Sequence, residues 1–373
     1  MTVRIMHAAD LHLGRTFPEL GDVGPARGGD LFETFDRICT EALDNEVVAL
    51  LLAGDLFDTF APSAEVVGRV QGQFERLTRA GVHIYVVPGD ADSATYERSI
   101  WRREAFEGVH VFLASTFETQ SFEVGDTTVH VHGIAFDQSA NPEPASTLQT
   151  GIAGIHIALL HATADGPGAL VGADHYFPVH SAELFATGVN YVALGHQHNR
   201  QQIPGRNGVC ACYPGSPEGL ELDEAGARYI ALVEFDDGPP EVSFLEVNRR
   251  QIVNATVDTT DCGPAEVAEK LLEFSGDDVL LTVRLAGTPR VMLDEQDLSH
   301  MVADGFFRLE LRDETTLSAS AFAAAIAGEN TIRGHFVGTL QRRISSTRDV
   351  EERAALERAL KLGLRSLQRS NAA

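Results

Sequence analysis

Residues 47–58 read V-V-A-L-L-L-A-G-D-L-F-D, an apolar run followed by a loop that carries two aspartates. A short run of Val, Leu and Ala that ends at a glycine is typical of a buried strand. Strands of this kind belong to layered α/β folds, in which reactive side chains gather in the loops at the carboxyl ends of the strands. The stretch therefore predicts an α/β fold with a polar site around Asp55.

The same pattern of an apolar run and a polar loop occurs four more times. The apolar runs cover residues 3–8, 82–87, 155–160 and 191–194. The loops after them contain Asp10-Leu11-His12, Gly89-Asp90-Ala91-Asp92, His161, and Gly195-His196-Gln197-His198. One Asp-x-His or one histidine at a strand end occurs often by chance, but folding constraints alone do not produce this ordered series. We interpret the five loops as one site.

Helical patterns separate the strands and extend the α/β prediction. Residues 31–45 and 64–80 carry apolar side chains at helical spacing, and Gly81 ends the second pattern. Between residues 110 and 135 the apolar period becomes two, with Gly125-Asp126 as the expected hairpin turn. After Arg250 we expect a smaller α/β unit with helices at 264–274, 295–303 and 319–327 and strands at 279–285 and 306–311.

The last segment, residues 350–368, predicts an amphipathic helix. Leu356, Leu360, Leu364 and Leu367 fall on one face of it. A terminal helix of this kind either docks on its own domain or binds a partner, and the sequence leaves both alternatives open.

The charge balance limits what the chain alone can bind. Its 373 residues include 29 Lys and Arg against 54 Asp and Glu, for a formal net charge of −25. This balance argues against non-specific coating of nucleic acid unless bound cations or a basic partner compensate. No run reaches the ~20 apolar residues of a membrane span, the N-terminus enters a strand at once, and the four cysteines are widely scattered. We expect a cytoplasmic protein without a membrane span.

The residue types in the five loops indicate divalent metal ions. Mixed imidazole and carboxylate ligands suit Mn, Zn or Fe, whereas Mg and Ca prefer nearly all-oxygen ligands. A carboxylate shared by two ions holds them ~3.5–4 Å apart, so that one ion activates a water and both neutralise phosphate oxygens. Phosphoester hydrolysis is the reaction class that this chemistry predicts.

The order of the loops resembles that of the calcineurin-like metallophosphoesterases. Five stretches are similar to the SbcD family of DNA repair exonucleases, particularly its YhaO-like branch: H-A-A-D-L-H-L-G-R (7–15), L-L-A-G-D-L-F-D (51–58), H-V-H-G-I-A-F (130–136), Y-V-A-L-G-H-Q-H (191–198) and Y-P-G-S-P-E-G-L-E-L-D-E (213–224). The resemblance implies a four-layer α/β/β/α sandwich over residues 1–250, a smaller α/β capping domain over 251–345 and a C-terminal partner-binding helix over 346–373.

The resemblance also implies roles for single residues, with two divalent ions, expected to be Mn, as cofactors. Asp10, His12 and His198 would hold the first ion, Asp55 would bridge, and His161 and His196 would hold the second. Asp90 stands where the family has an asparagine ligand, and its oxygen can coordinate as well as an amide oxygen. We expect Asp55, His161 and Asp92 to be catalytic residues. Arg15 is a candidate contact for substrate phosphate, and a plain surface arginine is the alternative.

One position departs from the family pattern. Ala91 occupies the place of the family's histidine that assists the leaving group, in a loop that normally reads G-N-H-D. A methyl group neither donates a proton nor forms a hydrogen bond, and loss of general-acid assistance commonly costs ~10²- to 10⁴-fold in rate. The sequence therefore predicts intact metal binding and attenuated catalysis.

Three functions remain open at this point. The favoured one is a metal-dependent DNA exo- and endonuclease that works in DNA repair or processing as a homodimer, with an SbcC-like coiled-coil ATPase bound through the C-terminal helix. The second is an attenuated metallophosphoesterase that serves as a scaffold for the ATPase, an alternative that Ala91 and the acidic charge favour. The third is a small-molecule phosphodiesterase, against which the additional α/β unit after residue 250 argues.

Overall fold

The computed structural model describes residues 2–135, 147–148, 150–165, 176–205, 210–316, 326 and 329–369. Contacts between Cα atoms divide the chain into two compact units, Met1–Gln251 and Ile252–Ala373. The helix expected at 319–327 falls, except for residue 326, outside the described residues. Among the described helices, none is long and apolar enough to cross a membrane.

The first unit contains two six-stranded sheets, the first of which has the order β14-β13-β1-β2-β3-β4. Strands β1 to β4 run parallel, and β13 pairs with β1 in the antiparallel sense. The buried strands predicted at 3–8, 47–53 and 82–87 are confirmed. The bounds are β1 (Val3–Ala8), β2 (Ala49–Ala53), β3 (His83–Val87), β4 (Val109–Val111), β13 (Tyr229–Phe235) and β14 (Glu241–Glu246).

The second sheet has the order β11-β12-β10-β7-β6-β5. Its central strands β6, β7, β10 and β12 are parallel, while β5 and β11 pair with their neighbours in the antiparallel sense. Val124 lies opposite Thr127, which confirms the hairpin turn predicted at Gly125-Asp126. The bounds are β5 (Glu118–Val124), β6 (Thr127–Ile134), β7 (Ile155–His161), β10 (Tyr191–Gly195), β11 (Gln201–Pro204) and β12 (Cys210–Tyr213), and a separate two-stranded sheet pairs β8 (Thr163–Ala164) with β9 (Pro178–Val179).

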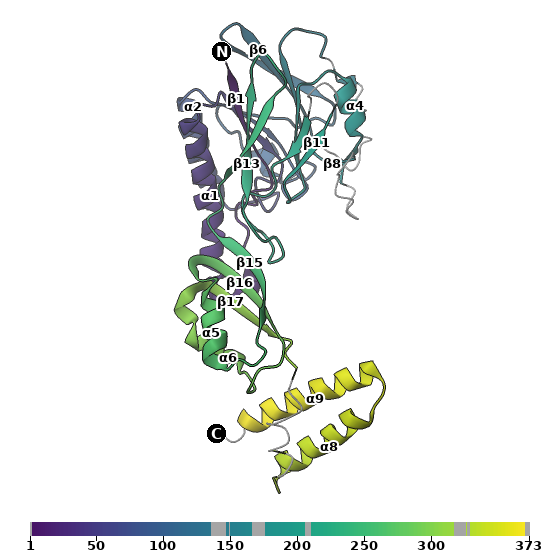
Figure 1. The fold of residues 1–373 in the computed structure, drawn as a ribbon. Coiled ribbons are helices and arrows are strands. Elements are labelled where there is room, and N and C mark those ends of the chain that lie inside the picture. Colours follow the sequence, from purple (N-terminus) through teal and green to yellow (C-terminus); the bar gives the residue numbers. More distant parts are fainter. Residues whose placement is uncertain are drawn as a thin grey trace. The chain divides into compact units, whose positions relative to one another are not determined.

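The two sheets of the first unit pack face to face through an apolar core. Leu51 and Tyr85 from the first sheet share this core with Val131, Leu159 and Ala193 from the second. Because side chains alternate along a strand, a second set on β7 and β10 faces away from the first sheet and packs with Leu184 of α4 (Ser181–Ala186). Figure 1 shows α4 on one side of the paired sheets and α1 (Gly24–Asp44) and α2 (Ala64–Arg79) on the other. The α/β class predicted from the sequence is confirmed.

Helix α1 begins at Gly24, before the predicted start at residue 31. Pro25 is compatible with the first turn of a helix, and the next turn contains two buried charged residues in place of apolar ones. Arg27 is 1% exposed and forms an ion pair of 2.7 Å with Glu218. The prediction of the helix start relied on the spacing of apolar residues, and a turn that is buried through ion pairs has no such spacing. Short elements beside this helix and later in the unit are η1 (Pro18–Val23) and α3 (Ile100–Arg103).

The second unit contains a three-stranded sheet covered by helices. The strand order is β15-β16-β17, and β16 and β17 run parallel. Val283 of β16 packs in one core with Val267 and Leu298 from the helices. The bounds are β15 (Gln251–Asp258), β16 (Gly276–Ala286), β17 (Phe306–Asp313), α5 (Pro264–Leu272), α6 (Glu295–Met301) and η4 (Ala303–Gly305). The helices and strands predicted at 264–311 are confirmed, and the sequence reading missed β15.

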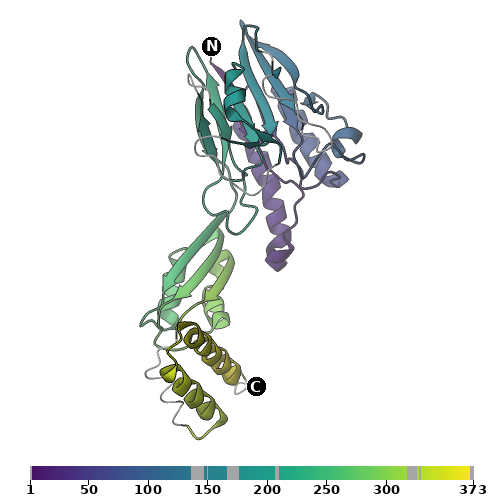
Figure 2. The same cartoon turned by 90° about the vertical axis from the view of Figure 1, so that its right-hand side faces the viewer.

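The second unit ends in a helical hairpin of α8 (Ile332–Ser346) and α9 (Val350–Arg369), which lie side by side in Figures 1 and 2. Leu360 and Leu364 of α9 share an apolar cluster with Val337 of α8. Leu360 and Leu364 of the terminal helix therefore dock on their own chain, as the first of the two alternatives expects.

Candidate metal centre

The five predicted loops meet at the carboxyl ends of the two sheets. Asp10, Asp55 and Asp90 follow β1, β2 and β3, while His161 ends β7 and His196 follows β10. The structure brings all seven predicted metal ligands together in three overlapping groups, and the ligand atoms of each group lie within 4.8 Å of one another. The groups are Asp10, His12 and His198; Asp90, His161 and His196; and Asp10, Asp55 and His161.

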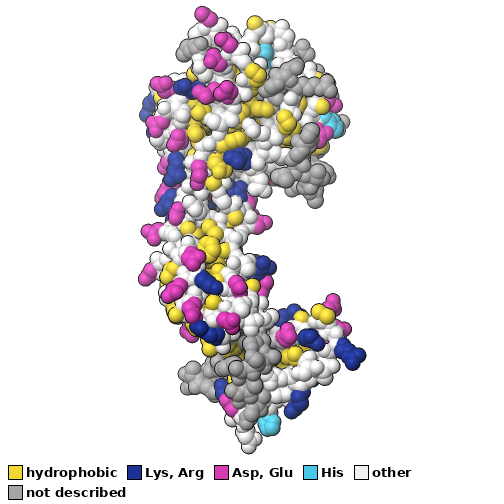
Figure 3. Space-filling model, viewed as in Figure 1, with side chains coloured by type: hydrophobic (Ala, Val, Ile, Leu, Met, Phe, Trp, Pro, Cys, Tyr) yellow, Lys and Arg dark blue, Asp and Glu magenta, His cyan; other side chains and the backbone are white. Residues whose placement is uncertain are grey.

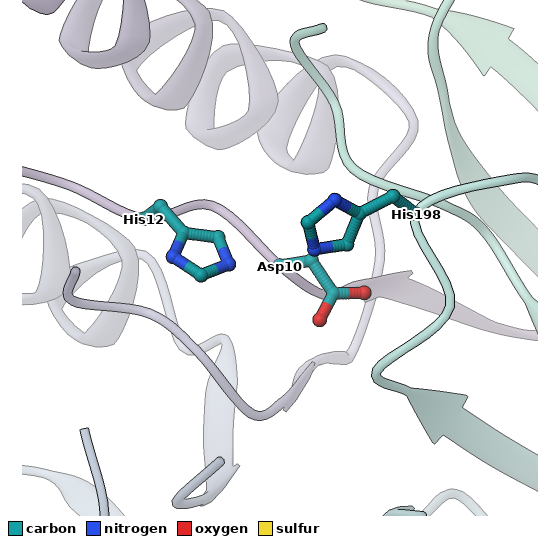
Figure 4. Close-up of side chains that lie close together, drawn as sticks. All are labelled: Asp10, His12 and His198. Carbon is teal, nitrogen blue, oxygen red and sulfur yellow. The ribbon is translucent and has the colours of Figure 1, made fainter. Parts of the chain in front are cut away.

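Asp10, His12 and His198 form the group drawn in Figure 4. Asp10 and His12 come from the loop after β1, and His198 comes from the loop after β10. Asp10 is fully buried, and its carboxylate accepts the backbone N–H of His196 at 3.0 and 3.2 Å. The first ligand of this group therefore also connects the first sheet to the second.

Asp90, His161 and His196 form the second group. Nε2 of His161 lies 2.9 Å from Oδ1 of Asp90, and Nδ1 of His196 lies 3.4 Å from the same oxygen. The side chain of Asp90 is 47% exposed, while that of His161 is 1% exposed. Asp90 thus closes this group on the solvent side, with its oxygen directed at both imidazoles.

Asp55 lies between the two groups. Its Oδ2 atom is 3.5 Å from Nε2 of His12 and 3.6 Å from Nε2 of His161. Its other oxygen, Oδ1, accepts the backbone N–H of Ala91 at 2.9 Å. One carboxylate oxygen therefore faces both groups, while the backbone of the third loop fixes the other.

Hydrogen-bond acceptors outside the groups orient three of the imidazoles. The Nδ1 atoms of His12, His161 and His198 lie 3.1 Å from Oδ1 of Asp58, 2.8 Å from the carbonyl oxygen of Ala53 and 2.7 Å from Oε1 of Glu224. An acceptor at Nδ1 places the proton there and leaves Nε2 as the coordinating atom. The sequence analysis assigned no role to Asp58 or Glu224, although both lie in stretches that carried the resemblance.

The backbone of the centre is strained where the ligands stand. In the described part of the chain seven non-glycine residues have positive φ, and Asp10, His12, Asp55 and His196 are four of them. This conformation is unfavourable for residues with a Cβ atom, and its occurrence concentrates at functional sites. The N–H of His12 donates to the carbonyl of Asp55 at 2.9 Å, so the first two loops hold each other in this form.

Three glycines in these loops, Gly54, Gly89 and Gly195, have no room for a side chain. A Cβ atom at Gly89 would overlap the carboxylate of Asp55. The loop after β3 therefore approaches the central carboxylate as closely as a backbone can, which a glycine alone permits.

The electrostatics of the cluster favour positive charge at its middle. Burial lowers the pKa of His161, but the nearby carboxylates of Asp55, Asp90 and Asp10 outweigh burial and raise it to about 10. Among the described residues, no Lys or Arg forms an ion pair with any of these three carboxylates. Nε2 of His12 is buried and finds no hydrogen-bond partner in the part of the chain that the structure describes. A set of carboxylate oxygens, imidazole nitrogens and one unpartnered buried nitrogen fits divalent ions.

Two further predicted residues, Asp92 and Arg15, have other contacts. Asp92 is fully buried, and its oxygens accept the backbone N–H groups of Gly89 at 2.7 Å and Phe57 at 3.2 Å. Its carboxylate therefore ties the third loop to the second and belongs to none of the three ligand groups. The guanidinium of Arg15 forms an ion pair with Glu221 and lies 4.0 Å from Asp58.

An aromatic residue that the sequence analysis did not single out packs against the second group. The ring of Tyr176 lies 5.5 Å from the ring of His161, edge to face, and 5.5 Å from that of His196, stacked. Tyr176 is separated from His161 by a stretch with little apolar pattern, so the sequence carried no signal for this contact.

Comparison with known proteins identifies the family. The profile of the family described as calcineurin-like phosphoesterase matches residues 3–200. The chain is 29% identical over 292 residues to the uncharacterized metallophosphoesterase YhaO of Bacillus subtilis, covering 76% of this chain and 69% of the relative. It is 26% identical over 329 residues to the DNA double-strand break repair protein Mre11 of Methanopyrus kandleri, covering 76% and 70%. It is 26% identical over 276 residues to the SbcD component of the nuclease SbcCD of Escherichia coli K12, covering 64% and 66%. The matched region contains every loop of the metal centre. The chain belongs to the calcineurin-like phosphoesterase family.

Proposed function

We propose that the chain is a metal-dependent DNA nuclease subunit that hydrolyses phosphodiester bonds at the centre formed by the five loops. The observation that carries the proposal is the position of Asp55, whose single oxygen faces a histidine of each ligand group at 3.5 and 3.6 Å. Relatives whose names describe DNA break repair and nuclease activity support DNA as the substrate.

In this proposal the chain's residues hold two divalent ions, with Mn as the expected metal. Asp10, His12 and His198 hold one ion, Asp90, His161 and His196 hold the other, and Asp55 bridges. When bound, the two ions supply an activated water and neutralise the charge that develops on the phosphate oxygens. Asp55 and His161 act by holding the ions at the reacting phosphate, while Asp92 acts by holding the third loop in place. Arg15 contacts substrate phosphate when it leaves Glu221.

In this proposal the loop after β3, which carries Ala91, limits the rate of phosphodiester cleavage. Ala91 contributes its backbone N–H to Asp55 at 2.9 Å, and its methyl group offers no proton to a leaving oxygen. Asp92 is held by two backbone amides and does not replace the missing donor. We therefore expect slow cleavage with intact metal binding, and the same observation favours the second candidate function, an attenuated scaffold.

The α8–α9 hairpin is the proposed surface for a coiled-coil ATPase partner. Residues 329–369 contain nine Lys and Arg against five Asp and Glu, although the whole chain has a net charge of −25. Figure 3 shows several of these basic side chains on the hairpin. An apolar depression on α8 is lined by Ile332, His335, Phe336, Thr339 and Leu340, and Ile332 is 83% exposed. An apolar groove with basic surroundings suits an amphipathic helix with an acidic rim. We further propose that the chain forms a homodimer and acts in the cytoplasm.

The test is Mn²⁺-dependent cleavage of end-labelled single-stranded and blunt duplex DNA by the purified protein. We expect weak cleavage that disappears with chelator and with Asp55→Ala. Asp44→Ala, an identical substitution at an exposed position of α1, serves as the matched control and should leave cleavage unchanged. Cleavage no faster than that of Asp55→Ala, measured also with an added SbcC-like ATPase, would replace the nuclease proposal with the scaffold.

A further inference from the structure

A stacked pair of aromatic rings, one half-buried and one exposed, follows two of the loops that carry metal ligands. Phe60 follows the loop of Asp55 and Asp58, and Tyr96 follows the loop of Asp90 and Asp92. Their ring centroids are 4.4 Å apart with an interplanar angle of 29°, and Tyr96 is 51% exposed. Each of the two loops that carry ligands therefore contributes one ring to a stacked pair that is open to solvent.

The backbone holds this pair in place. The N–H of Ile100 donates to the carbonyl of Phe60 at 2.7 Å, and the N–H of Ser99 donates to the carbonyl of Tyr96 at 3.0 Å. Both donors belong to the start of α3, so one short helix fixes both rings. A surface that is rigid before it binds loses little conformational entropy on binding.

The packing of the two loops does not depend on the exposed ring. Beneath them Phe57, Trp101 and Phe106 form a buried aromatic cluster with centroid distances of 5.4, 5.4 and 6.4 Å. Trp101 is 4% exposed and Phe106 is 6% exposed. This cluster anchors the segment, and the half-exposed Tyr96 is left with a surface that packing does not use.

The pair is tied to the metal centre through the loops that carry it. Phe60 closely follows Asp58, whose carboxylate contacts His12, and Tyr96 closely follows Asp92, whose carboxylate accepts the N–H of Gly89. A separate ring, that of Tyr176, lies 5.5 Å from each of the two ligand histidines of the second group.

Exposed arginines follow the pair, interspersed with the exposed Glu97 and Glu104. Arg98, Arg102 and Arg103 follow Tyr96 within one segment, and all three are exposed. Arg102 donates its Nε–H to the carbonyl of Ala94, and among the described residues Arg98 and Arg103 form no ion pair. In a chain of net charge −25, exposed arginines beside an open aromatic ring favour a ligand with both phosphates and flat bases.

We propose that Tyr96, backed by Phe60, stacks an unpaired nucleobase of the strand whose phosphodiester is bound at the metal centre. The inference rests on the proposed nuclease function and deepens it, because it assigns Tyr96 as a residue that positions the substrate strand. A base inside a duplex has both faces covered by its neighbours, whereas every unpaired base presents a π-face.

The test compares the binding of two fluorescent ten-residue oligonucleotides by anisotropy, with Ca²⁺ in place of Mn²⁺ to limit cleavage. One is oligothymidylate, and the other has the same backbone with abasic sites throughout. Wild-type protein should bind the first more tightly by ~5- to 150-fold, the range that one stacking contact gives. Tyr96→Ala should abolish most of that difference, and Tyr96→Trp should keep it. Ile152→Ala, an exposed apolar position before β7 at the far end of that strand, is the matched control and should bind as wild type.

The outcomes separate this inference from the function on which it rests. Equal affinity of wild type and Tyr96→Ala for oligothymidylate overturns the stacking proposal, even if both proteins cleave DNA. A wild-type protein that binds neither oligonucleotide overturns the stacking proposal together with the nuclease function. Two Mn²⁺ ions per chain in Tyr96→Ala, measured by titration calorimetry, show that the loss of base preference does not arise from damage to the metal centre.

Discussion

His198 is held in place by Glu224, whose Oε1 atom lies 2.7 Å from Nδ1 of the imidazole. The same carboxylate accepts the backbone N–H of Leu220 at 2.8 Å and lies 3.5 Å from the guanidinium of Arg228. A carboxylate fixed in this way determines both the tautomer and the direction of the ring it contacts. Nε2 of His198 is therefore directed to the group that contains Asp10 and His12.

Glu224→Gln and Glu224→Ala should both weaken binding of the first Mn²⁺ ion, by ~10- to 100-fold, because such outer partners contribute that much to metal affinity. Titration calorimetry and Mn²⁺ electron paramagnetic resonance would measure the change. Glu241→Gln on β14, an exposed glutamate of the same unit, should leave the affinity unchanged. Unaltered affinity in both Glu224 variants would remove Glu224 from the centre.

Ala91→His should raise the rate of cleavage by ~10²- to 10⁴-fold, because it adds a proton donor to a loop whose backbone already contacts Asp55. The double variant with Asp90→Asn tests whether the extra charge at position 90 also slows the reaction. Single-turnover cleavage of a labelled oligonucleotide, at a metal concentration that saturates each variant, isolates the chemical step. An unchanged cleavage rate in both variants would mean that another side chain already donates the proton.

Gly89→Ala should abolish tight metal binding and destabilise the fold, because its Cβ atom would overlap the carboxylate of Asp55. Gly72→Ala is the matched substitution in helix α2, where a Cβ atom meets nothing within 4 Å. That change should stabilise the protein by about 0.5–1 kcal/mol, since alanine is the better helix former. Urea unfolding of both variants in chelator and in Mn²⁺ measures the two effects. Equal free energies of unfolding for Gly89→Ala and Gly72→Ala would refute the steric argument.

Acid should destabilise the first unit through three stacked histidines on β6 and β7, remote from the metal centre. His130 and His156 stack at 4.6 Å, and His132 and His156 stack at 5.2 Å. The hydroxyl of Thr119 donates to His132, Nε2 of His132 donates to His156, and Nε2 of His156 donates to the carbonyl of Ile152. Among the described residues no carboxylate pairs with these rings, so the chain of hydrogen bonds is complete only when the imidazoles are neutral.

Burial and the neighbouring imidazoles lower the pKa of His132 to about 4. Because the unfolded chain binds this proton near pH 6.5, the free energy of unfolding should fall as the pH drops from 6.5 towards 4, by on the order of 2 kcal/mol for this residue. His132→Gln should flatten that part of the profile. Urea unfolding at several pH values would measure both proteins, and parallel profiles would show that the stack does not titrate on unfolding.

The sequence predicted the parts of the fold that follow local rules. The apolar run before Asp55 is β2, and the equivalent runs before Asp10 and Asp90 are β1 and β3. Their loops could be grouped from the sequence because parallel strands end at one edge of a sheet. The start of α1 was missed because Arg27 is buried through ion pairs, which leave no apolar period.

The contacts around the ligands needed the structure. His198 and Glu224 are separated by 26 residues, and Asp58 and His12 by 46, so no spacing rule joins them. The stacked pair of Phe60 and Tyr96 is equally remote in sequence. For the terminal helix the leucine stripe was visible, but its burial against Val337 depends on α8, a helix that the sequence reading did not identify.

The hydrogen bond from the His196 N–H to the Asp10 carboxylate has a consequence for the order in which the protein loses metal and structure. Each sheet supplies only part of the ligand set, so the centre exists only while the two sheets are correctly docked. Metal affinity therefore depends on the packing of the two sheets against each other. Mild heating or acid that loosens the core between the sheets should release metal while the far-ultraviolet circular dichroism of the strands and helices is still unchanged.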